Sequence, residues 1–412
     1  MRERLTNWAG NIEFGARRLH RPRTLDELRE VVSGSERVRV LGSGHSFNRL
    51  ADTDGDLVSL AALPRTVEIS ADRTSVRVDG GIRYGELAAH LAAEGLAVHN
   101  MASLPHISVA GAVATATHGS GVRHGNLATA VSGLEILRAD GSVTVLDRSD
   151  PSFAGAVVGL GALGVVTALT LDVVPAFELR QYVYENLPEA SLPGHLEEIL
   201  SAGYSVSLFT RWTGAGIDQV WLKRAEELSG DLFGARPADG PRHPVPGMPT
   251  VNCTEQGGVP GPWHERLPHF RMEFTPSSGE ELQSEWHVPR SEALSAIGAV
   301  AGLRERVAAV LQVCEIRTIA ADDLWLSPNH GRDSLALHFT WIADTEAVLP
   351  VVADLEKALA PLDARPHWGK IFTTAPAGLR ESYERFDDFV ALVDRFDPQG
   401  TFGNPYLDTL LR

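Results

Sequence analysis

The stretch VRVLGSGHSFN, residues 38–48, joins a short run of β-branched residues to a Gly-Ser-Gly turn that is followed at once by a histidine. The two glycines around Ser43 let the backbone turn tightly and present consecutive N–H groups, an arrangement that suits a phosphate or pyrophosphate. His45 would then project from a backbone that lies against the ligand. The alternative is an ordinary tight turn with a surface histidine, and this stretch alone does not separate the two.

A second segment rich in small residues, ASLPHISVAGAVATATHGSG, occupies residues 102–121. Small side chains let a flat or extended ligand lie against the main chain, where hydroxyls and amides satisfy its polar atoms. The alternative is a glycine-rich core strand. Two such segments, each with a histidine, make a nucleotide-type cofactor a candidate ligand.

A third glycine motif, GLGALG at residues 159–164, matches the spacing GxGxxG. A dinucleotide-binding fingerprint must follow a strand and open a helix. Here the helix-like FAGAVV precedes the motif and the strand-like VVTALTL follows it. We therefore reject a nicotinamide-binding Rossmann site and expect these glycines to form a turn near a ligand.

The remaining pattern predicts a chain of mixed helices and strands. Residues 22–32 predict a helix, with Thr24 as its N-cap and Glu27 completing a capping box. The ADG turn between two alternating runs predicts a hairpin at 133–146. Residues 303–312, LRERVAAVLQ, predict a further helix.

Residues 229–270 are crowded with Pro and Gly and show no hydrophobic periodicity. So long a loop inside a compact domain is usually either functional or mobile. We therefore expect this segment to have a functional part or to move.

Two late strands, VCEIRTI at 313–319 and LALHFTW at 335–341, carry polar residues two positions apart, which place them on one face. With neighbouring segments, the polar set is Gln283, Glu315, Arg317, His338, Thr340 and Lys370. Such a face costs free energy if it is buried without partners. It therefore either faces solvent, the ordinary case in an antiparallel sheet, or lines a polar pocket. A polyhydroxylated ligand would need such a lining, because each hydroxyl both donates and accepts.

Composition narrows the classes of partner. The 412-residue chain has a formal net charge of −16, which repels phosphate backbones, so we expect no nucleic-acid partner. Cys253 and Cys314 are its two cysteines, which give no disulfide framework or zinc pattern and fit a reducing compartment. The histidines form no HExxH motif, so we expect no metal. No apolar leader and no long apolar stretch occur, so we expect a cytoplasmic protein without membrane contact.

In their order along the chain, these motifs resemble the flavoprotein oxidases of the vanillyl-alcohol-oxidase type, and within them the FAD-dependent alditol (xylitol, sorbitol) oxidases. The resemblance covers nearly the whole chain. Its motifs are NWAGN (7–11), LGSGHSFN (41–48), the segment 102–121, GLGALGVVTALTL (159–171), CEIRTI (314–319), LHFTW (337–341), HWGK (367–370) and FDPQGTFGNPYL (396–407).

The resemblance implies an α+β fold with two domains. An FAD-binding domain would span residues 1–175 and be completed by the C-terminal segment 375–412. A substrate-binding (cap) domain, residues 176–374, would place an antiparallel sheet over the flavin.

The resemblance also implies that His45 is bonded covalently to the 8α-methyl carbon of FAD, which fixes the ring and raises its redox potential. The other implied FAD contacts are Gly42, Ser43, Gly44, Ser46, Ser108, Gly111, Thr115, Ala116, Thr117, His118 and Val166. Ala102 holds a position where relatives differ in oxygen access, and a small residue there favours an oxidase over a dehydrogenase.

The implied reaction converts the terminal alcohol of a polyol and O2 into an aldose and hydrogen peroxide. The implied substrate-binding residues are Ser103, Gln283, Glu315, Arg317 and Thr340. We expect His338 to act as the base, Lys370 to assist it beside the flavin, and Arg317 to steady the developing alkoxide. Nearby positive charge lowers the pKa of a histidine or lysine and so prepares it to accept a proton.

We expect the protein to be a monomer. Two alternatives stay open at this point. A sugar-lactone oxidase of the gulonolactone or arabinonolactone type would share the fold and the histidine of the GSGHS turn. A polyol-binding protein without chemistry would need neither His45 nor a flavin.

Overall fold

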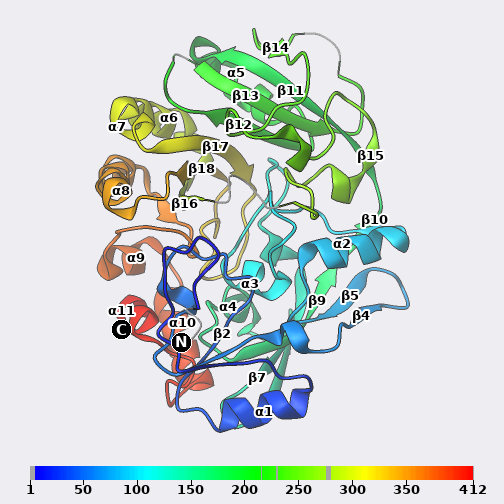
Figure 1. Ribbon diagram of the computed structural model, residues 1–412, viewed down its shortest axis with the longest axis vertical. Coiled ribbons are helices and arrows are strands. Elements are labelled where there is room, and N and C mark those ends of the chain that lie inside the picture. The colour runs from blue at the N-terminus through cyan, green and yellow to red at the C-terminus, as the bar shows by residue number, and fades with distance from the viewer. Residues whose placement is uncertain (1–4, 215, 229–230, 275–279, 412) are drawn as a thin grey trace.

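The computed structural model describes residues 5–214, 216–228, 231–274 and 280–411. Its strands form a small parallel sheet, a five-stranded antiparallel sheet, a nine-stranded sheet and a two-stranded pair. Helices are interspersed irregularly among these strands, so the fold is α+β, as predicted. Figure 1 shows the two smaller sheets in the lower half of the molecule and the nine-stranded sheet in the upper half.

The chain begins with a parallel sheet in the order β1-β3-β2. Its elements are β1 (Arg18–His20), α1 (Leu25–Ser33), β2 (Val38–Val40) and β3 (Asp56–Val58). Thr24 caps α1 as predicted, because its Oγ1 accepts a hydrogen bond from the Glu27 N–H at 3.1 Å. The Glu27 carboxylate accepts from the N–H of Arg23 at 2.7 Å, so the predicted capping box is displaced by one residue.

The five-stranded antiparallel sheet has the order β4-β5-β9-β7-β8. Its strands are β4 (Val67–Ile69), β5 (Ser75–Asp79), β7 (Val131–Leu137), β8 (Val143–Asp147) and β9 (Val165–Asp172). Strands β7 and β8 are the predicted hairpin, with Gly141 at a φ of +82° in the turn. Three helices accompany this sheet: α2 (Tyr84–Ala93), α3 (Val109–Ala114) and α4 (Phe153–Val157). The pair of β6 (Leu96–Ala97) with β10 (Val174–Pro175) lies at the junction with the large sheet.

The nine-stranded sheet has the order β14-β11-β13-β12-β17-β18-β16-β19, and β15 pairs with β11 beside this path. Neighbouring strands are antiparallel. The strands are β11 (Glu178–Pro188), β12 (Ser205–Thr210), β13 (Gly216–Arg224), β14 (Arg236–Pro237), β15 (Gly261–Pro262), β16 (Leu282–Pro289), β17 (Leu311–Ile319), β18 (Ser334–Trp341) and β19 (Arg365–Pro366).

Helices cover one face of the nine-stranded sheet. They are α5 (Leu192–Leu200), α6 (Ala293–Ala301), α7 (Arg304–Ala308) and α8 (Thr345–Leu359). Alternation along the strands sends residues such as Leu337 and Phe339 into the core beneath these helices. The predicted helix at 303–312 is shorter than expected, because β17 begins at Leu311. The residues that alternate with these, such as His338, point to the opposite face of the sheet, which these helices do not cover.

The C-terminal helices return to the N-terminal part of the chain (Figure 1). They are α9 (Pro376–Ser382), α10 (Phe386–Phe396) and α11 (Pro405–Leu411). Helix α10 contacts α4, and α11 contacts the 3-10 helix η1 (Arg49–Ala51). In the part of the chain that the structure describes, no helix has the length and hydropathy needed to cross a lipid bilayer.

Candidate active site

The turn after β2 approaches the start of α3 closely. A Cβ on Gly42 would lie 2.5 Å from Ser108 Oγ, so only glycine fits at this approach. Gly44 has a φ of +71°, which glycine adopts without strain, and its carbonyl oxygen accepts from the N–H of Trp8 at 2.9 Å. The two small-residue segments of the sequence therefore meet in space.

The His45 side chain is half-buried against the N-terminal segment. Its ring stacks on the indole of Trp8, with centroids 4.3 Å apart and 24° between the planes. Its Nε2 is buried and has no hydrogen-bond partner among the described residues. Burial, with the nearby charges of His106 and Lys370, lowers its pKa to about 3, so the ring is neutral at neutral pH. The alternative of an ordinary turn with a surface histidine does not fit these observations.

A cavity of about 250 Å³ extends from this turn to the large sheet. The predicted cofactor-binding residues that line it are Gly42, Ser43, Gly44, His45, Ser46, Ser108, Gly111, Thr115, Thr117, His118 and Val166. Ala102 and Ser103 line it as well. Ala116 is not part of this lining, because its backbone has a φ of +53° and its side chain lies in the hydrophobic core.

The GLGALG turn also borders the cavity, through Gly159, Gly161 and Gly164. Helix α4 precedes this turn and strand β9 follows it, so the order is the reverse of a dinucleotide-binding fingerprint, as predicted. The prediction of a turn beside a ligand site fits this position.

The polar face of the large sheet forms the other wall of the cavity. Gln283, Glu315, Arg317, His338, Thr340 and Lys370 all line it. Strand register explains why three of the polar side chains converge, because His338 is paired with Glu285 on β16 and with Glu315 on β17. His338 is 8% exposed and Glu315 is 5% exposed, so a solvent-facing sheet is excluded and the face lines a polar pocket.

Glu285 stands at the centre of this wall, and the sequence analysis missed it. Its Oε1 accepts from His118 Nε2 at 2.8 Å and from the Arg317 guanidinium at 3.0 Å, while its Oε2 contacts Lys370 Nζ. Burial alone would raise the pKa of this carboxyl group, but Lys370, His118 and Arg317 hold it well below its usual value. Glu285 is therefore ionised and offsets the positive charges around it. Its position two residues after Gln283 on a strand was the signal that could have revealed it.

The segment that carries Lys370 runs alongside β16 and is tied to the His45 turn. The N–H of His367 donates to the Glu285 carbonyl, and that of Ile371 to the Gln283 carbonyl, both at 2.9 Å. The Asn48 side-chain amide donates to the Lys370 carbonyl at 2.8 Å. These bonds hold Lys370 between the turn and the polar wall.

The basic groups of the wall have shifted pKa values. Burial lowers the pKa of Lys370, and burial together with the charge of Lys370 lowers the pKa of His338 to about 4. Burial would also lower the pKa of Arg317, but Glu315 and Glu285 raise it, so the guanidinium stays charged. The wall therefore offers a neutral imidazole beside a fixed cation.

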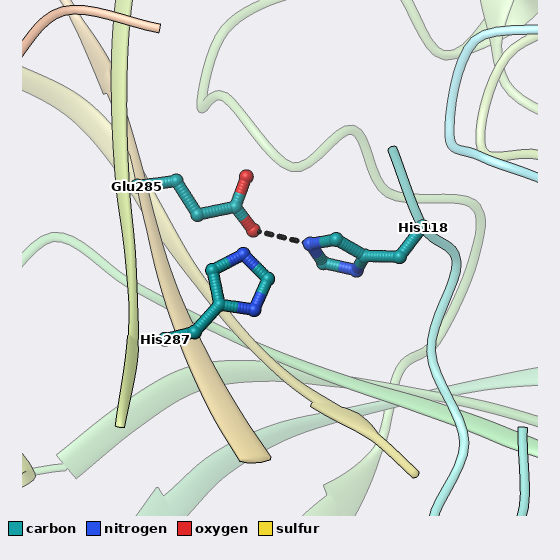
Figure 2. Close-up of side chains that lie close together, drawn as sticks. All are labelled: His118, Glu285 and His287. Atoms are coloured by element: carbon teal, nitrogen blue, oxygen red, sulfur yellow. Dashed lines mark hydrogen bonds and ion pairs between the residues drawn. The ribbon is translucent and has the colours of Figure 1, made fainter. Parts of the chain in front are cut away.

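Figure 2 shows His118, Glu285 and His287 close together, with His118 from the loop after α3 and the other two from β16. Their ligand atoms lie within 4.8 Å of one another, a spacing that could suit a metal ion. Glu285 already contacts two cationic side chains, Arg317 and Lys370, which would repel a cation. We assign the trio to the hydrogen-bond network of the wall, and the absence of a metal stays a prediction.

The residues around the cavity fit FAD. Gly42, Gly44 and Gly111 line the cavity without side chains, which leaves their backbone open to a flat or extended group. The buried and unpartnered Nε2 of His45 is a polar atom that this structure leaves unexplained without a further group.

Comparison with known proteins identifies the class. The sequence profile of the FAD binding domain family matches residues 16–147, and that of D-arabinono-1,4-lactone oxidase matches residues 278–410. A solved structure of a solvent-stable cholesterol oxidase has a TM-score of 0.79 at 17% identity, covering 99% of this chain and 97% of that one. Cholesterol oxidase from B. sterolicum has a TM-score of 0.80 at 16% identity, covering 99% and 96%. The predicted vanillyl-alcohol-oxidase-type fold is confirmed, and the cofactor is FAD.

The sequence relatives narrow the assignment within this class of FAD-dependent oxidoreductases. Alditol oxidase from Streptomyces sp. is 57% identical over 99% of both chains. L-gulono-1,4-lactone dehydrogenase from Mycobacterium tuberculosis is 30% identical over 98% of both, and L-gulonolactone oxidase from Mus musculus is 26% identical over 98% of this chain and 97% of that one. The chain belongs to the alditol oxidase family.

Proposed function

We propose that this protein oxidises the terminal primary alcohol of alditols such as xylitol and sorbitol to the aldose, with O2 as acceptor. One observation carries the proposal: a single cavity joins the small-residue cradle around His45 to a buried wall of hydroxyl-binding side chains. The 57% identity to an alditol oxidase over the full chain supports the same reaction.

FAD, when bound, accepts a hydride from the substrate carbon and passes two electrons to O2, which gives hydrogen peroxide. We assign its contacts to the small-residue segments on either side of Ser108 and its covalent attachment to His45. The stacked indole of Trp8 holds the His45 ring in one orientation. The low pKa of His45 keeps one ring nitrogen unprotonated and able to form a bond. Ala102, with its small side chain on the cavity, leaves room for oxygen.

The polar wall binds the polyol chain in this proposal. The side chains of Gln283, Thr340 and Ser103 can each donate and accept hydrogen bonds, as a chain of hydroxyls requires. The ionised Glu315 accepts from substrate hydroxyls, because Arg317 and His269 hold its pKa below the usual value despite burial. Burial makes these bonds selective, since a substrate that lacks a hydroxyl leaves a polar group unpaired.

His338 accepts the proton of the reacting hydroxyl. Its imidazole is neutral above about pH 4. With the ring proton on Nδ1, which lies 3.4 Å from Glu285 Oε2, the Nε2 atom, 3.2 Å from Thr340 Oγ1, is free to accept a proton. Lys370 assists from the same side, and the fixed charge of Arg317 stabilises the developing alkoxide. Glu285 keeps both cations in place.

The test of the reaction is an optical spectrum recorded before and after anaerobic addition of xylitol, followed by peroxide release in air. We expect the flavin absorbance to bleach with xylitol and sorbitol and to return with O2. A protein that is colourless, or that keeps its spectrum with every polyol, contradicts the proposal and leaves the polyol-binding alternative.

The sugar-lactone alternative rests on the D-arabinono-1,4-lactone oxidase profile that matches residues 278–410. The same peroxide assay with L-gulono-1,4-lactone separates the two activities. We expect faster turnover with xylitol, and a clear preference for the lactone would reverse the assignment.

The covalent link predicts a simple outcome for His45→Ala. Flavin should stay with the acid-precipitated wild-type protein and should be released from the variant, because the variant has no imidazole to form the bond. Trp8→Phe is the matched control, since it keeps an aromatic ring against the imidazole. Flavin that precipitates with the His45→Ala protein would contradict the attachment at this residue.

We propose two domains with the boundaries 1–175, completed by 375–412, and 176–374. The contacts of α10 with α4 and of α11 with η1 support the return of the C-terminal segment to the first domain. The location of the nine-stranded sheet between Glu178 and Pro366 supports the second.

A further inference from the structure

The segment rich in Pro and Gly reaches the cavity in its middle and at its end. Of its described part, residues 231–270, the side chains of Pro244, Val245, His269 and Phe270 line the cavity. The His269 imidazole is 4% exposed and lies between β13 and β17. Its Nε2 is 2.7 Å from Glu315 Oε1, and its Nδ1 is 3.0 Å from Lys223 Nζ.

The two partners of the His269 ring assign its proton. Lys223 is 1% exposed, and its Nζ has three partners: the carbonyl oxygens of Leu267 and Pro268 and His269 Nδ1. The ionised Glu315 carboxylate can only accept, so His269 Nε2 donates to it, and in the neutral ring Nδ1 accepts from Lys223. The ring proton of His269 therefore lies on Nε2, which donates to Glu315.

This hydrogen bond fixes the Glu315 carboxylate through Oε1, the oxygen that we do not assign to substrate binding. Oε1 is occupied by His269, while Oε2 lies 3.6 Å from Arg317 Nε. One oxygen is thus committed to the protein, and the other is left for Arg317 and for a ligand in the cavity. A carboxylate without the His269 donor would be free to rotate away from this arrangement.

We propose that His269, held by Lys223, is a positioning residue that orients Glu315 and thereby sets the affinity of the site for polyol hydroxyls. The proposal rests on the proposed function of Glu315 in binding the polyol. His269 itself is not a base, because its Nδ1 accepts from Lys223 and its Nε2 carries the proton. Lys223 has a second effect, since it anchors the end of the segment through the two carbonyls.

A purely space-filling role is the competing explanation, because the His269 ring also packs edge-on against Trp221 and Phe209, with centroids 5.1 and 5.5 Å apart. Two variants separate the explanations. His269→Phe keeps a ring of similar size and removes the donor. His269→Gln has a smaller apolar volume but keeps both functions, because its amide nitrogen can donate to Glu315 while its oxygen accepts from Lys223.

The experiment measures the xylitol KM and the limiting rate of anaerobic flavin reduction in the holoenzyme. Because Glu315 binds hydroxyls before and during the reaction, we expect His269→Phe to raise KM by on the order of 10- to 100-fold. The limiting reduction rate should change much less, and the flavin content should stay at the wild-type level. His269→Gln should recover most of the affinity. His264→Leu, a histidine of the same segment outside the cavity lining, is the control and should keep the wild-type KM.

Each result decides a different question. Wild-type enzyme that xylitol does not reduce refutes the proposed function and not the role of His269. If xylitol reduces the wild type but KM is unchanged in His269→Phe, the positioning role is wrong. A His269→Gln variant as impaired as His269→Phe shows that the ring acts by packing.

A second measurement tests the proposal if the His269→Phe protein fails to fold. In a protein labelled with 15N-histidine, the His269 resonances are those absent from the His269→Gln variant. We expect nitrogen shifts of a neutral ring protonated at Nε2. Shifts of a ring protonated at Nδ1, or of an imidazolium, overturn the proton assignment and the proposal with it.

Discussion

At the scale of single residues, the candidate site is organised around one buried carboxylate. Glu285 contacts Arg317 through Oε1 and Lys370 through Oε2, so each cation has its own oxygen. A buried charge of this kind is stable only when it is paired, because desolvation would otherwise neutralise it. The pairing holds two positive charges on the cavity wall, next to the neutral imidazole of His338.

These charges give the first prediction for catalysis. Arg317→Ala and Lys370→Ala should each slow anaerobic reduction of the flavin by xylitol on the order of 100- to 1000-fold, because each removes charge from beside the reacting hydroxyl. FAD should stay bound, since its proposed contacts lie on other segments. Stopped-flow absorbance measures the rate, and the spectrum measures the flavin content.

Arg180→Ala is a control for loss of a cation from the same sheet, because Arg180 on β11 bonds the Gly258 carbonyl and does not line the cavity. It should reduce at the wild-type rate. Wild-type rates in the Arg317 and Lys370 variants would remove both residues from the catalytic assignment.

At the scale of elements, alternation along strands placed Glu315, Arg317, His338 and Thr340 on one face, and this was predictable from the sequence. Whether that face is buried was not, because the same alternation occurs in a solvated antiparallel sheet. Burial comes from segments distant in sequence that line the same cavity, such as the His45 turn, the pair Pro244 and Val245, and the pair His269 and Phe270.

The missed contacts have the same cause. Lys223 meets His269 across 46 residues of a segment without periodicity, and no local pattern encodes such a contact. Strand alternation could have placed Glu285 on the polar face. Its four partners could not be predicted in this way, because they come from separate parts of the chain. The truncated helix at 303–312 reflects strand pairing of Leu311 with Trp341, which outweighs local helix propensity.

One side chain joins several elements of the N-terminal part and carries a stability prediction. Arg39 on β2 is 4% exposed, and its guanidinium donates to four carbonyl oxygens at 2.6–2.8 Å, those of Leu50, Leu160, Gly161 and Phe402. Arg39→Met keeps the aliphatic stem but leaves these carbonyls without the donor. We expect the free energy of unfolding in urea to fall by roughly 3–5 kcal/mol.

Arg37→Met is the matched control, two residues earlier in the chain. Arg37 is more exposed and forms long ion pairs, at 3.7 Å with Asp54 and 3.6 Å with Asp408. Exposed pairs of this kind contribute about 1 kcal/mol or less. Equal losses of unfolding free energy in the two variants would show that the buried hydrogen bonds of Arg39 contribute no more to stability than the exposed ion pairs of Arg37.

At the scale of the whole molecule, buried histidines make the fold sensitive to acid. Burial, first among the causes, lowers the pKa of His124, His269 and His338 to about 4 from an unfolded value of 6.5. Between these values the unfolded chain binds the proton and the folded chain does not. The stabilising contribution is therefore present above pH 6.5 and is lost as the pH falls towards 4.

Asp322 acts in the opposite direction. Burial raises its pKa to about 6, so its contribution favours the folded state at low pH and is lost as the pH rises through 6. The ionised Glu285 and Glu315 have the same sign as the histidines, because their pKa values are lowered in the folded protein. Three histidines outweigh one aspartate when each shift amounts to about 2 kcal/mol at pH 5.

We therefore expect the urea midpoint of the holoenzyme to fall steadily between pH 7.5 and pH 5. His124→Gln removes one of these histidine titrations at a site outside the cavity lining, so it should flatten this slope. Asp322→Asn removes the opposing contribution and should steepen it. Equilibrium unfolding followed by tryptophan fluorescence measures the midpoints. A midpoint that stays constant or rises towards pH 5 would show that the buried histidines gain their protons without opposing the fold, and that burial lowers their pKa values less than the geometry indicates.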